Sequence, residues 1–320
     1  MLITMTSRPP VAAQPAELPA AGCRRAAIAL GVFDGVHLGH QAILRELTGL
    51  AAKTNASPVA LFFDPHPRAV LFPEQPLPLL TAVPHRELLL GAAGAACLIR
   101  FPFSPELAAM PPMAFLDRYF LVPDLTITGF CIGENWRFGR RNAGTAATLA
   151  EWSSRRQIST VPVPSVRHQE GLVSSTRIRQ AVGQGDLAAA AAMLGRPFSL
   201  LGRVVHGYGQ GSTVLQCPTA NLIAENTILP PYGVYAATAQ DRERQFRGIV
   251  YVGDAPTLRH DSRPRVYVEL HLFDCNYDLY DRELHVEFRL FLRPSRKFSS
   301  PEELKAQIDR DIKAALAGPW

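Results

Sequence analysis

Two histidines three residues apart, His37 and His40, could each donate a hydrogen bond to the oxygens of a phosphate group. Three glycines lie around them, Gly31, Gly35 and Gly39, and glycine lets the backbone approach a ligand closely or adopt a positive φ. The pair stands just before an apolar pattern with helical spacing. Because the first N–H groups and the positive dipole end of a helix favour an anion, this stretch favours binding of a nucleotide phosphate.

A strand and a helix joined by a tight turn would position these histidines. Residues 26–30 are a short apolar run typical of a buried parallel strand, and from Gln41 apolar residues recur at helical spacing. An ordinary βα turn is the alternative for an isolated H-x-x-H pair. A zinc site is disfavoured because no third ligand stands at a standard spacing, and no P-loop sequence G-x-x-x-x-G-K-[ST] is present.

A second candidate segment, D-P-H-P-R, follows an apolar strand predicted at residues 59–63. Prolines on both sides of His66 would fix an extended turn. His66 and Arg68 would then lie at the carboxyl end of the strand, where open α/β sheets bind ligands. A surface proline turn is the alternative.

A third segment, G-E-N-W-R-F-G at residues 133–139, follows a strand predicted at 125–131. Trp136 and Phe138 could stack on a flat ring, or they could fill the core, and the sequence leaves both possibilities open. Asn135 adds an amide beside this aromatic pair.

A fourth segment, V-S-S-T-R-I-R, begins at Val173. Ser174 or Ser175 is a strong helix N-cap, and helical spacing puts Thr176 and Arg179 near the first turn. Hydroxyls, backbone amides and a guanidinium at one helix N-terminus predict a second phosphate site, with simple capping as the alternative.

The order of the predicted elements indicates the fold class. Strands and helices alternate up to about residue 185, which predicts an α/β doubly wound parallel sheet. The second half is dominated by strands joined by short turns, which predicts a small antiparallel β-barrel followed by an amphipathic C-terminal helix at 301–316. The strands expected there span residues 200–206, 234–239, 246–252, 265–273 and 284–292.

A chain of 320 residues is long for one core, so two domains are expected. We expect a flexible leader at 1–22, which is rich in Pro and Ala, and a first domain at 23–185. A linker helix at 186–197 and a second domain at 198–320 complete the prediction.

Composition limits the class of protein. With 47% hydrophobic and 19% charged residues, the chain is typical of globular proteins. A formal net charge of +5, with no basic run and no interleaved aromatic residues, suits anionic small molecules and predicts no nucleic-acid partner. Five scattered cysteines and the lack of a secretory signal or an apolar span predict a cytoplasmic protein without membrane contact, a transit peptide being the alternative.

Two features of the second half could carry chemistry. Thr219 and Asn221, in P-T-A-N, offer oxygen ligands suited to Mg²⁺ and nucleotide phosphates. In the strand predicted at 265–273 the apolar residues share one face, and Glu269 stands on the other. Strand geometry alone also allows Glu269 to be a solvated carboxylate paired with a charge on a neighbouring strand.

The motifs together resemble a known family. G-V-F-D-G-V-H-L-G-H is similar to the signature of nucleotidylyltransferases that transfer AMP from ATP, and F-D-G-V-H, F-F-D-P-H-P-R-A-V-L and S-S-T-R-I-R resemble the flavin-adenylating branch. The order V-V-H-G, P-T-A-N-L, P-x-G-V-Y-A, V-G-D-A-P-T-L, V-E-L-H-L and R-x-x-R-K-F resembles riboflavin kinase. Residues 26–316 therefore resemble the bacterial bifunctional riboflavin kinase/FMN adenylyltransferase family.

The resemblance implies a nucleotidylyltransferase-like Rossmann fold, phosphorylation of riboflavin to FMN, and adenylylation of FMN to FAD with release of pyrophosphate. ATP and flavins would be the substrates, with Mg²⁺, in a monomer or weak homo-oligomer. The catalytic residues implied are His37, His40, Arg179 and Glu269. Those implied for ATP or phosphate are Gly31, Phe33, Asp34, Gly35, Gly39, Ser174, Ser175, Thr176, Gly207, Thr219 and Asn221, the last two also as metal ligands. Those implied for flavin are Pro65, His66, Pro67, Arg68, Asn135, Phe138 and Tyr235.

The chain departs from the family pattern at several points. Asn135 and Trp136 replace Asp and Phe, and G-S-T-V-L-Q-C precedes P-T-A-N where the family has G-R-x-x-G-F. The third residue of L-Y-G is Asp281, and a Glu near R-x-x-R-K-F is Ser295. An adenylyltransferase with a decayed kinase half, and a non-catalytic flavin- or nucleotide-binding regulator, are therefore the alternatives.

Overall fold

The computed structural model describes residues 8–169, 171–205, 219–223, 227–242, 244–254, 266–275 and 279–318. The contacts within the chain group into two compact units. The first unit comprises the residues up to 78 together with 83–175, and the second comprises 79–82 and the residues from 176 onward. Across the described ranges, no helix has both the length and the apolar character that a membrane span requires.

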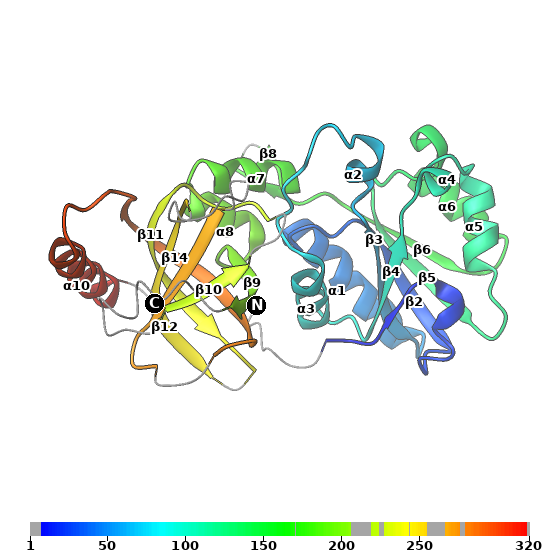
Figure 1. Ribbon diagram of the computed structural model, residues 1–320. Coiled ribbons are helices and arrows are strands. Elements are labelled where there is room, and N and C mark those ends of the chain that lie inside the picture. Colours follow the sequence, from blue (N-terminus) through cyan, green and yellow to red (C-terminus); the bar gives the residue numbers. More distant parts are fainter. Residues whose placement is uncertain are drawn as a thin grey trace. The chain divides into compact units, whose positions relative to one another are not determined.

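A six-stranded parallel sheet forms the centre of the first unit (Figure 1). The strand order is β1-β4-β3-β2-β5-β6, so the apolar strand β2 lies between β3 and β5. The strands are β1 (Val11–Ala12), β2 (Arg25–Leu30), β3 (Ser57–Asp64), β4 (Cys97–Pro102), β5 (Thr126–Gly133) and β6 (Ser159–Val163).

Helices cover both faces of this sheet. In Figure 1, α1 (Leu38–Lys53) and α3 (Val83–Ala92) lie on one side, while α5 (Pro112–Phe120) and α6 (Ala146–Ser154) lie on the other. The remaining short elements of the unit are η1 (Pro15–Glu17), α2 (Pro67–Leu71), α4 (Pro105–Ala108), η2 (Arg140–Asn142), β7 (Arg167–His168) and β8 (Gly171–Leu172). The doubly wound sheet expected from the sequence is confirmed.

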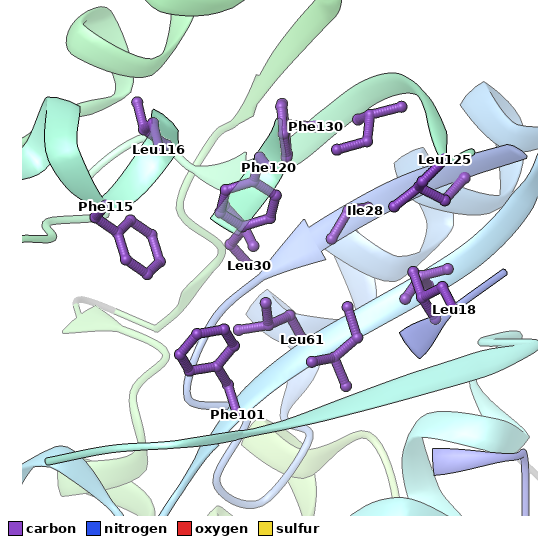
Figure 2. Packing of buried hydrophobic residues seen from close by; sticks show 14 of the residues in the cluster. Leu18, Ile28, Leu30, Leu61, Phe101, Phe115, Leu116, Phe120, Leu125 and Phe130 are labelled. Carbon is purple, nitrogen blue, oxygen red and sulfur yellow. The ribbon is translucent and has the colours of Figure 1, made fainter. Parts of the chain in front are cut away.

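Aromatic and aliphatic side chains fill the core between the sheet and α5 and α6. Figure 2 shows Leu18, Ile28, Leu30, Leu61, Phe101, Phe115, Leu116, Phe120, Leu125 and Phe130 of this cluster. Several ring pairs within it meet edge to face, as Phe120 and Phe130 do with centroids 5.3 Å apart, which is a preferred geometry for aromatic contacts. A dense core on this face gives the loops at the sheet edge a rigid support.

Residues 8–22 differ from the flexible leader expected from the sequence. Val11 and Ala12 pair with β4 at the edge of the sheet, and Leu18 is fully buried in the core. Prolines on either side of a two-residue strand, Pro10 and Pro15, hide it from a search for alternating patterns. The strand covers an edge of the sheet that would otherwise expose unpaired backbone groups.

A closed antiparallel barrel forms the second unit, as predicted. Its strand order is β10-β13-β12-β11-β14-β9, so the barrel closes between β9 and β10. The strands are β9 (Ser199–Val205), β10 (Thr219–Ile223), β11 (Gly233–Gln240), β12 (Gln245–Asp254), β13 (Val266–Leu272) and β14 (Glu283–Pro294). Strand β10 begins at Thr219, the second residue of the P-T-A-N segment, and was not predicted as a strand.

Among the described residues, three helices accompany the barrel strands. They are α7 (Ser175–Gly183), whose first residue belongs to the first unit, α8 (Leu187–Leu194) and α10 (Pro301–Ala317). Helix α10 lies on the outer face of the barrel (Figure 1), where Ala315 packs against Val234 and Ile249. A salt bridge between Arg293 and Asp311, with Nη2 and Oδ2 2.8 Å apart, fixes α10 to β14.

Candidate functional site

The candidate site of the first unit lies at the carboxyl edge of the parallel sheet. Strand β2 is central, with β3 on one side and β5 on the other. The chain runs from β2 to β3 and β4 on one side and then to β5 and β6 on the other, so this edge is the switch point at which open α/β sheets bind ligands. The loops after β2, β3 and β5 carry three of the four predicted segments.

The loop after β2 has an unusual backbone. Phe33, Gly35 and Val36 all have positive φ, at 54°, 84° and 40°. Positive φ is uncommon for a bulky residue and very uncommon for a β-branched one, and such strain clusters at functional sites. The side chains of Phe33 and Val36 are fully buried, so core packing holds the loop in this shape. Gly31 lets the Phe33 ring pass, because a Cβ at Gly31 would lie 3.0 Å from it.

His37 and His40 lie together at the start of α1. His37 is the N-cap, and its Nδ1 accepts a hydrogen bond from the backbone N–H of His40 at 3.3 Å. The two rings stack, with centroids 3.6 Å apart and planes 15° from parallel. Because Nδ1 of His37 is an acceptor, the proton of the neutral ring is on Nε2.

A hydrogen bond joins the V-S-S-T-R-I-R segment to the loop before His37. Ser175 Oγ donates to the backbone carbonyl of Asp34, with the two oxygens 2.9 Å apart. The first residue of α7 therefore contacts the loop that carries His37. Ser174 precedes the helix, while Thr176 and Arg179 follow on α7 in the second unit, and their roles stay predictions.

Sequence reasoning missed a buried ion pair behind this loop. Arg86 of α3 lies with Nη2 3.7 Å from Oδ1 of Asp34, and both side chains are 1% exposed. The Arg86 guanidinium also lies 5.4 Å from the centre of the Phe62 ring. The available signal was the charged run H-R-E inside an otherwise apolar helix, at residues 85–87.

The D-P-H-P-R segment forms the start of a short helix, where an extended turn was expected. His66 Nδ1 accepts a hydrogen bond from the N–H of Arg68 at 3.1 Å, and Pro67 is the first residue of α2. Proline suits this position because its missing N–H would have no intrahelical partner. Arg68 and Pro65 are exposed and His66 is half-buried, at the end of β3.

The third segment combines a core residue with a partly exposed ring. Phe138 is 6% exposed and belongs to the aromatic core, and Trp136 stacks on it at 4.6 Å. Asn135 donates to Ser165 Oγ at 3.1 Å. Glu134 accepts the Ser165 N–H, and this hydrogen bond lowers the pKa of Glu134. The structure thus gives Phe138 a packing role and leaves the half-buried Trp136 at the surface of the loop.

Asn221 and Glu269 are directly opposite each other on β10 and β13, on the same face of the barrel wall. Asn221 is 4% exposed, and its Oδ1 has no hydrogen-bond partner among the residues that the structure describes. A buried amide oxygen without a partner costs free energy that a bound cation or donor would recover. This observation fits a Mg²⁺ ligand beside the half-buried carboxylate of Glu269.

Some of the predicted site residues of the barrel lie outside the residues that the structure describes. Gly207 and the altered loop at 212–217 are outside the described residues, as is the side chain of Thr219. Tyr235, which the resemblance implies as a flavin contact, lies within the described residues. It is enclosed between Phe288 and Phe291, and its hydroxyl donates to the carbonyl of Pro231. Burial raises the pKa of Tyr235 to about 12, so the structure favours a packing role.

Two departures from the family pattern have a local structural role. Asp281 has a φ of 60°, and Asp is among the few residues that tolerate the left-handed region for which glycine is the default. The turn is therefore kept. Ser295 shares a hydrogen bond with the hydroxyl of Tyr251 at 3.0 Å.

Comparison with known proteins matches two families to successive parts of the chain. Residues 21–177 match the FAD synthetase family, and residues 194–317 match the riboflavin kinase family. A bifunctional riboflavin kinase/FMN adenylyltransferase of Bacillus subtilis is 31% identical over 91% of this chain and 92% of its own length. The protein of the same description from Pseudomonas fluorescens is 34% identical over 90% and 91%. A solved structure from Streptococcus pneumoniae, described as a macrolide-efflux protein, covers 92% of this chain and 95% of its own at 28% identity, with a TM-score of 0.78.

Proposed function

The chain belongs to the bifunctional riboflavin kinase/FMN adenylyltransferase family, and we propose how its residues divide the two reactions. It is an enzyme that phosphorylates riboflavin to FMN and adenylylates FMN to FAD. Matches to both families favour two activities over a decayed kinase half or a non-catalytic regulator. The boundaries 23–185, 186–197 and 198–320, a cytoplasmic location and a monomer or weak homo-oligomer are part of the proposal.

Adenylyl transfer is assigned to the loop after β2 and the start of α1. The phosphate of FMN attacks the α-phosphorus of ATP in line and displaces pyrophosphate, without a covalent enzyme intermediate. His37 and His40 donate to the transferred and leaving phosphates, where charge develops in the transition state. The observation that carries this assignment is the stacked pair of imidazoles at a helix N-terminus, which is a ready anion site.

Ser175, Thr176 and Arg179 are proposed to grip the β- and γ-phosphates. The hydrogen bond from Ser175 Oγ to Asp34 O supports this assignment, because it brings the start of α7 to the histidine loop. Arginine binds phosphate through two parallel N–H donors, which gives direction as well as charge. These groups hold ATP so that its α-phosphorus faces the incoming FMN.

The flavin ring is proposed to lie beside the loops after β3 and β5. Both strands neighbour β2, so the segments at 65–68 and 133–139 flank the histidine loop. Trp136 offers a flat aromatic surface that Phe138 supports from the core, and stacked rings gain dispersion and burial energy. Pro65, His66, Pro67, Arg68 and Asn135 would line the same side.

Riboflavin phosphorylation is assigned to the face of the barrel wall that holds Asn221 and Glu269. Glu269 takes the proton from the ribityl hydroxyl as that oxygen attacks the γ-phosphorus of ATP and displaces ADP. Asn221 and Thr219 would hold Mg²⁺, which supplies charge neutralisation of the ATP phosphates. The buried Asn221 Oδ1 opposite Glu269 supports this assignment.

One experiment tests the division of labour. Purified protein is incubated with ATP and Mg²⁺ and either riboflavin or FMN, and FMN, FAD and pyrophosphate are followed by chromatography. Glu269→Gln is expected to lose FMN formation and to form FAD from supplied FMN at the normal rate. A Glu283→Gln variant, on strand β14, which pairs with β9 and β11, serves as the control. Loss of both activities in Glu269→Gln, or retention of both, would refute the assignment.

A further inference from the structure

We propose that Arg86 is a positioning residue for adenylyl transfer, because its buried ion pair with Asp34 holds the phosphate-binding loop in its active shape. The proposal rests on the role proposed above for His37 and His40. The ion pair joins Arg86 to Asp34, three residues before His37, so the effect of Arg86 passes through the loop. Nothing in the sequence motifs assigns it a role.

The ion pair is enclosed on all sides. Arg86 and Asp34 are each 1% exposed, and Arg86 Nη2 lies 3.7 Å from Asp34 Oδ1. Burying a carboxylate is costly unless it is paired with an opposite charge. The guanidinium is itself located by the face of Phe62 on β3, 5.4 Å away. Arg86 therefore links a loop with a strained backbone to a rigid strand of the sheet.

The backbone of Asp34 makes a second contact, in addition to the ion pair of its side chain. Its carbonyl accepts the hydrogen bond of Ser175 Oγ, at 2.9 Å. Asp34 stands between Phe33 and Gly35, both of which have positive φ. A residue in such a segment can relax unless its surroundings fix it, and the side-chain and backbone contacts of Asp34 fix it at both ends. His37 follows three residues later, so a shift of Asp34 would move the imidazoles.

The size of the effect follows from the geometry of the reaction. Hydrogen-bond donors act on a developing charge only within a few tenths of an ångström of the right position, and a misplacement of about 1 Å can cost ~10²-fold in rate. Losing the ion pair should displace the loop by less than about 1 Å, because the Ser175 hydroxyl still holds the carbonyl of Asp34. We therefore expect a fall of about tenfold in kcat/KM for ATP.

Four variants test the proposal in the full chain. Arg86→Met removes the charge and keeps most of the length, while Arg86→Lys keeps the charge. Asp34→Asn with Arg86→Met removes both charges of the pair. Arg100→Met is the matched control, because Arg100 pairs with Glu87, the next residue of α3, at 3.6 Å.

Steady-state kinetics of FAD formation, with thermal unfolding measured in parallel, give the readout. Arg86→Met and the double variant are expected to lose about tenfold in kcat/KM for ATP, with KM for FMN changed less. Arg86→Lys is expected to recover most of the activity and Arg100→Met all of it. Riboflavin phosphorylation by the second unit is the internal control for folding and is expected to stay normal in all four variants.

Three results would overturn the proposal: normal FAD formation in Arg86→Met, full recovery in the double variant, or an equal loss of both activities. A failure of the histidine assignment looks different. If His40→Ala retains FAD formation, the phosphate site itself is misassigned. If His40→Ala is inactive while Arg86→Met is normal, only the positioning role is refuted.

Discussion

The imidazole of His37 lies parallel to that of His40, 3.6 Å away, with its Nδ1 bound to the backbone N–H of His40. This arrangement depends on the small residue between them. A Cβ at Gly39 would lie 3.1 Å from Cε1 and 3.2 Å from Nδ1 of His37. The stack, the N-cap and the glycine therefore form one unit, in which the direction of each ring is set by its neighbours.

Gly39→Ala is expected to separate stability from activity. Alanine favours a helix over glycine by about 1 kcal/mol, but the new methyl group pushes the His37 ring away from its position. We expect FAD formation to fall by about tenfold, while FMN formation and the melting temperature of the first unit are kept. Kinetics of FAD and FMN formation test the expected activities, and calorimetry tests the expected melting temperature. Gly49→Ala in the same helix is the control, because a Cβ there meets nothing within 4 Å; equal activities in the two variants would contradict the account.

Ser175→Ala removes the hydroxyl that ties the start of α7 to the carbonyl of Asp34. A hydrogen bond of this kind contributes about 1 kcal/mol to stability, so the fold should survive. We expect KM for ATP in FAD formation to rise by about tenfold, with KM for riboflavin unchanged. Ser154→Ala is the comparison, since Ser154 Oγ donates only to the carbonyl of Glu151 in its own helix. An unchanged KM for ATP in Ser175→Ala would argue against the proposed phosphate grip.

Asn221→Leu is expected to cost activity without costing stability. The Oδ1 of Asn221 is buried and lacks a hydrogen-bond partner among the described residues, so an apolar side chain of similar shape removes an unsatisfied group. FMN formation should fall by at least ~10²-fold, since an oriented oxygen ligand is lost. The free energy of unfolding of the ligand-free barrel should stay the same or rise. A strongly destabilised barrel would show instead that Asn221 is structural.

The barrel is expected to lose stability in mild acid because of His285. Burial, with added repulsion from Arg196 and Arg289, lowers the pKa of His285 to about 3. The folded state then keeps this ring neutral, while the unfolded chain protonates it below its ordinary pKa of 6.5. Stability is therefore full above pH 6.5 and falls toward pH 3, by about 2 kcal/mol at pH 5.

Hydrogen exchange of the β14 amides in the full chain measures this loss. His285→Gln cannot take up a proton, so its stability should change less between pH 6.5 and pH 4.5 than that of the natural protein. Identical pH dependence in the two proteins would show that His285 is not buried as a neutral ring. Carboxylates elsewhere in the chain also titrate in acid, and the comparison between the two proteins removes their contribution.

The architecture could be predicted from local sequence signals because most helices and strands have a recognisable pattern within a few residues. The apolar run before Gly31 and the helical spacing after Gln41 define a strand, turn and helix, and the glycine stop of α8 is seen as Gly195 with φ 69°. Strand β1 was missed, since two residues between prolines have no period. The helical start of α2 was missed because D-P-H-P-R also suits an extended turn.

At the site, the features that could not be predicted from the sequence are contacts between segments that are far apart in the chain. Nothing near Asp34 in the sequence indicates that its carboxylate pairs with Arg86, which lies more than fifty residues away. The choice between ligand contact and core packing was likewise open for Phe138; its burial in the aromatic core supports packing, and the flavin contact stays a prediction. Tyr235 was assigned by its motif to the flavin, but the barrel interior encloses it. Residue types and spacing predict chemistry, whereas burial depends on the whole fold.

The rate of FAD formation by His40→Ala, compared with its rate of FMN formation, tests the central claim most directly. The ring of His40 stacks on His37 and contacts Phe33 at 5.1 Å, inside the loop proposed to hold the transferred phosphate. The account predicts a fall of ~10²-fold or more in FAD formation from supplied FMN, with FMN formation from riboflavin unchanged in the same preparation. FAD formation at the normal rate would contradict it.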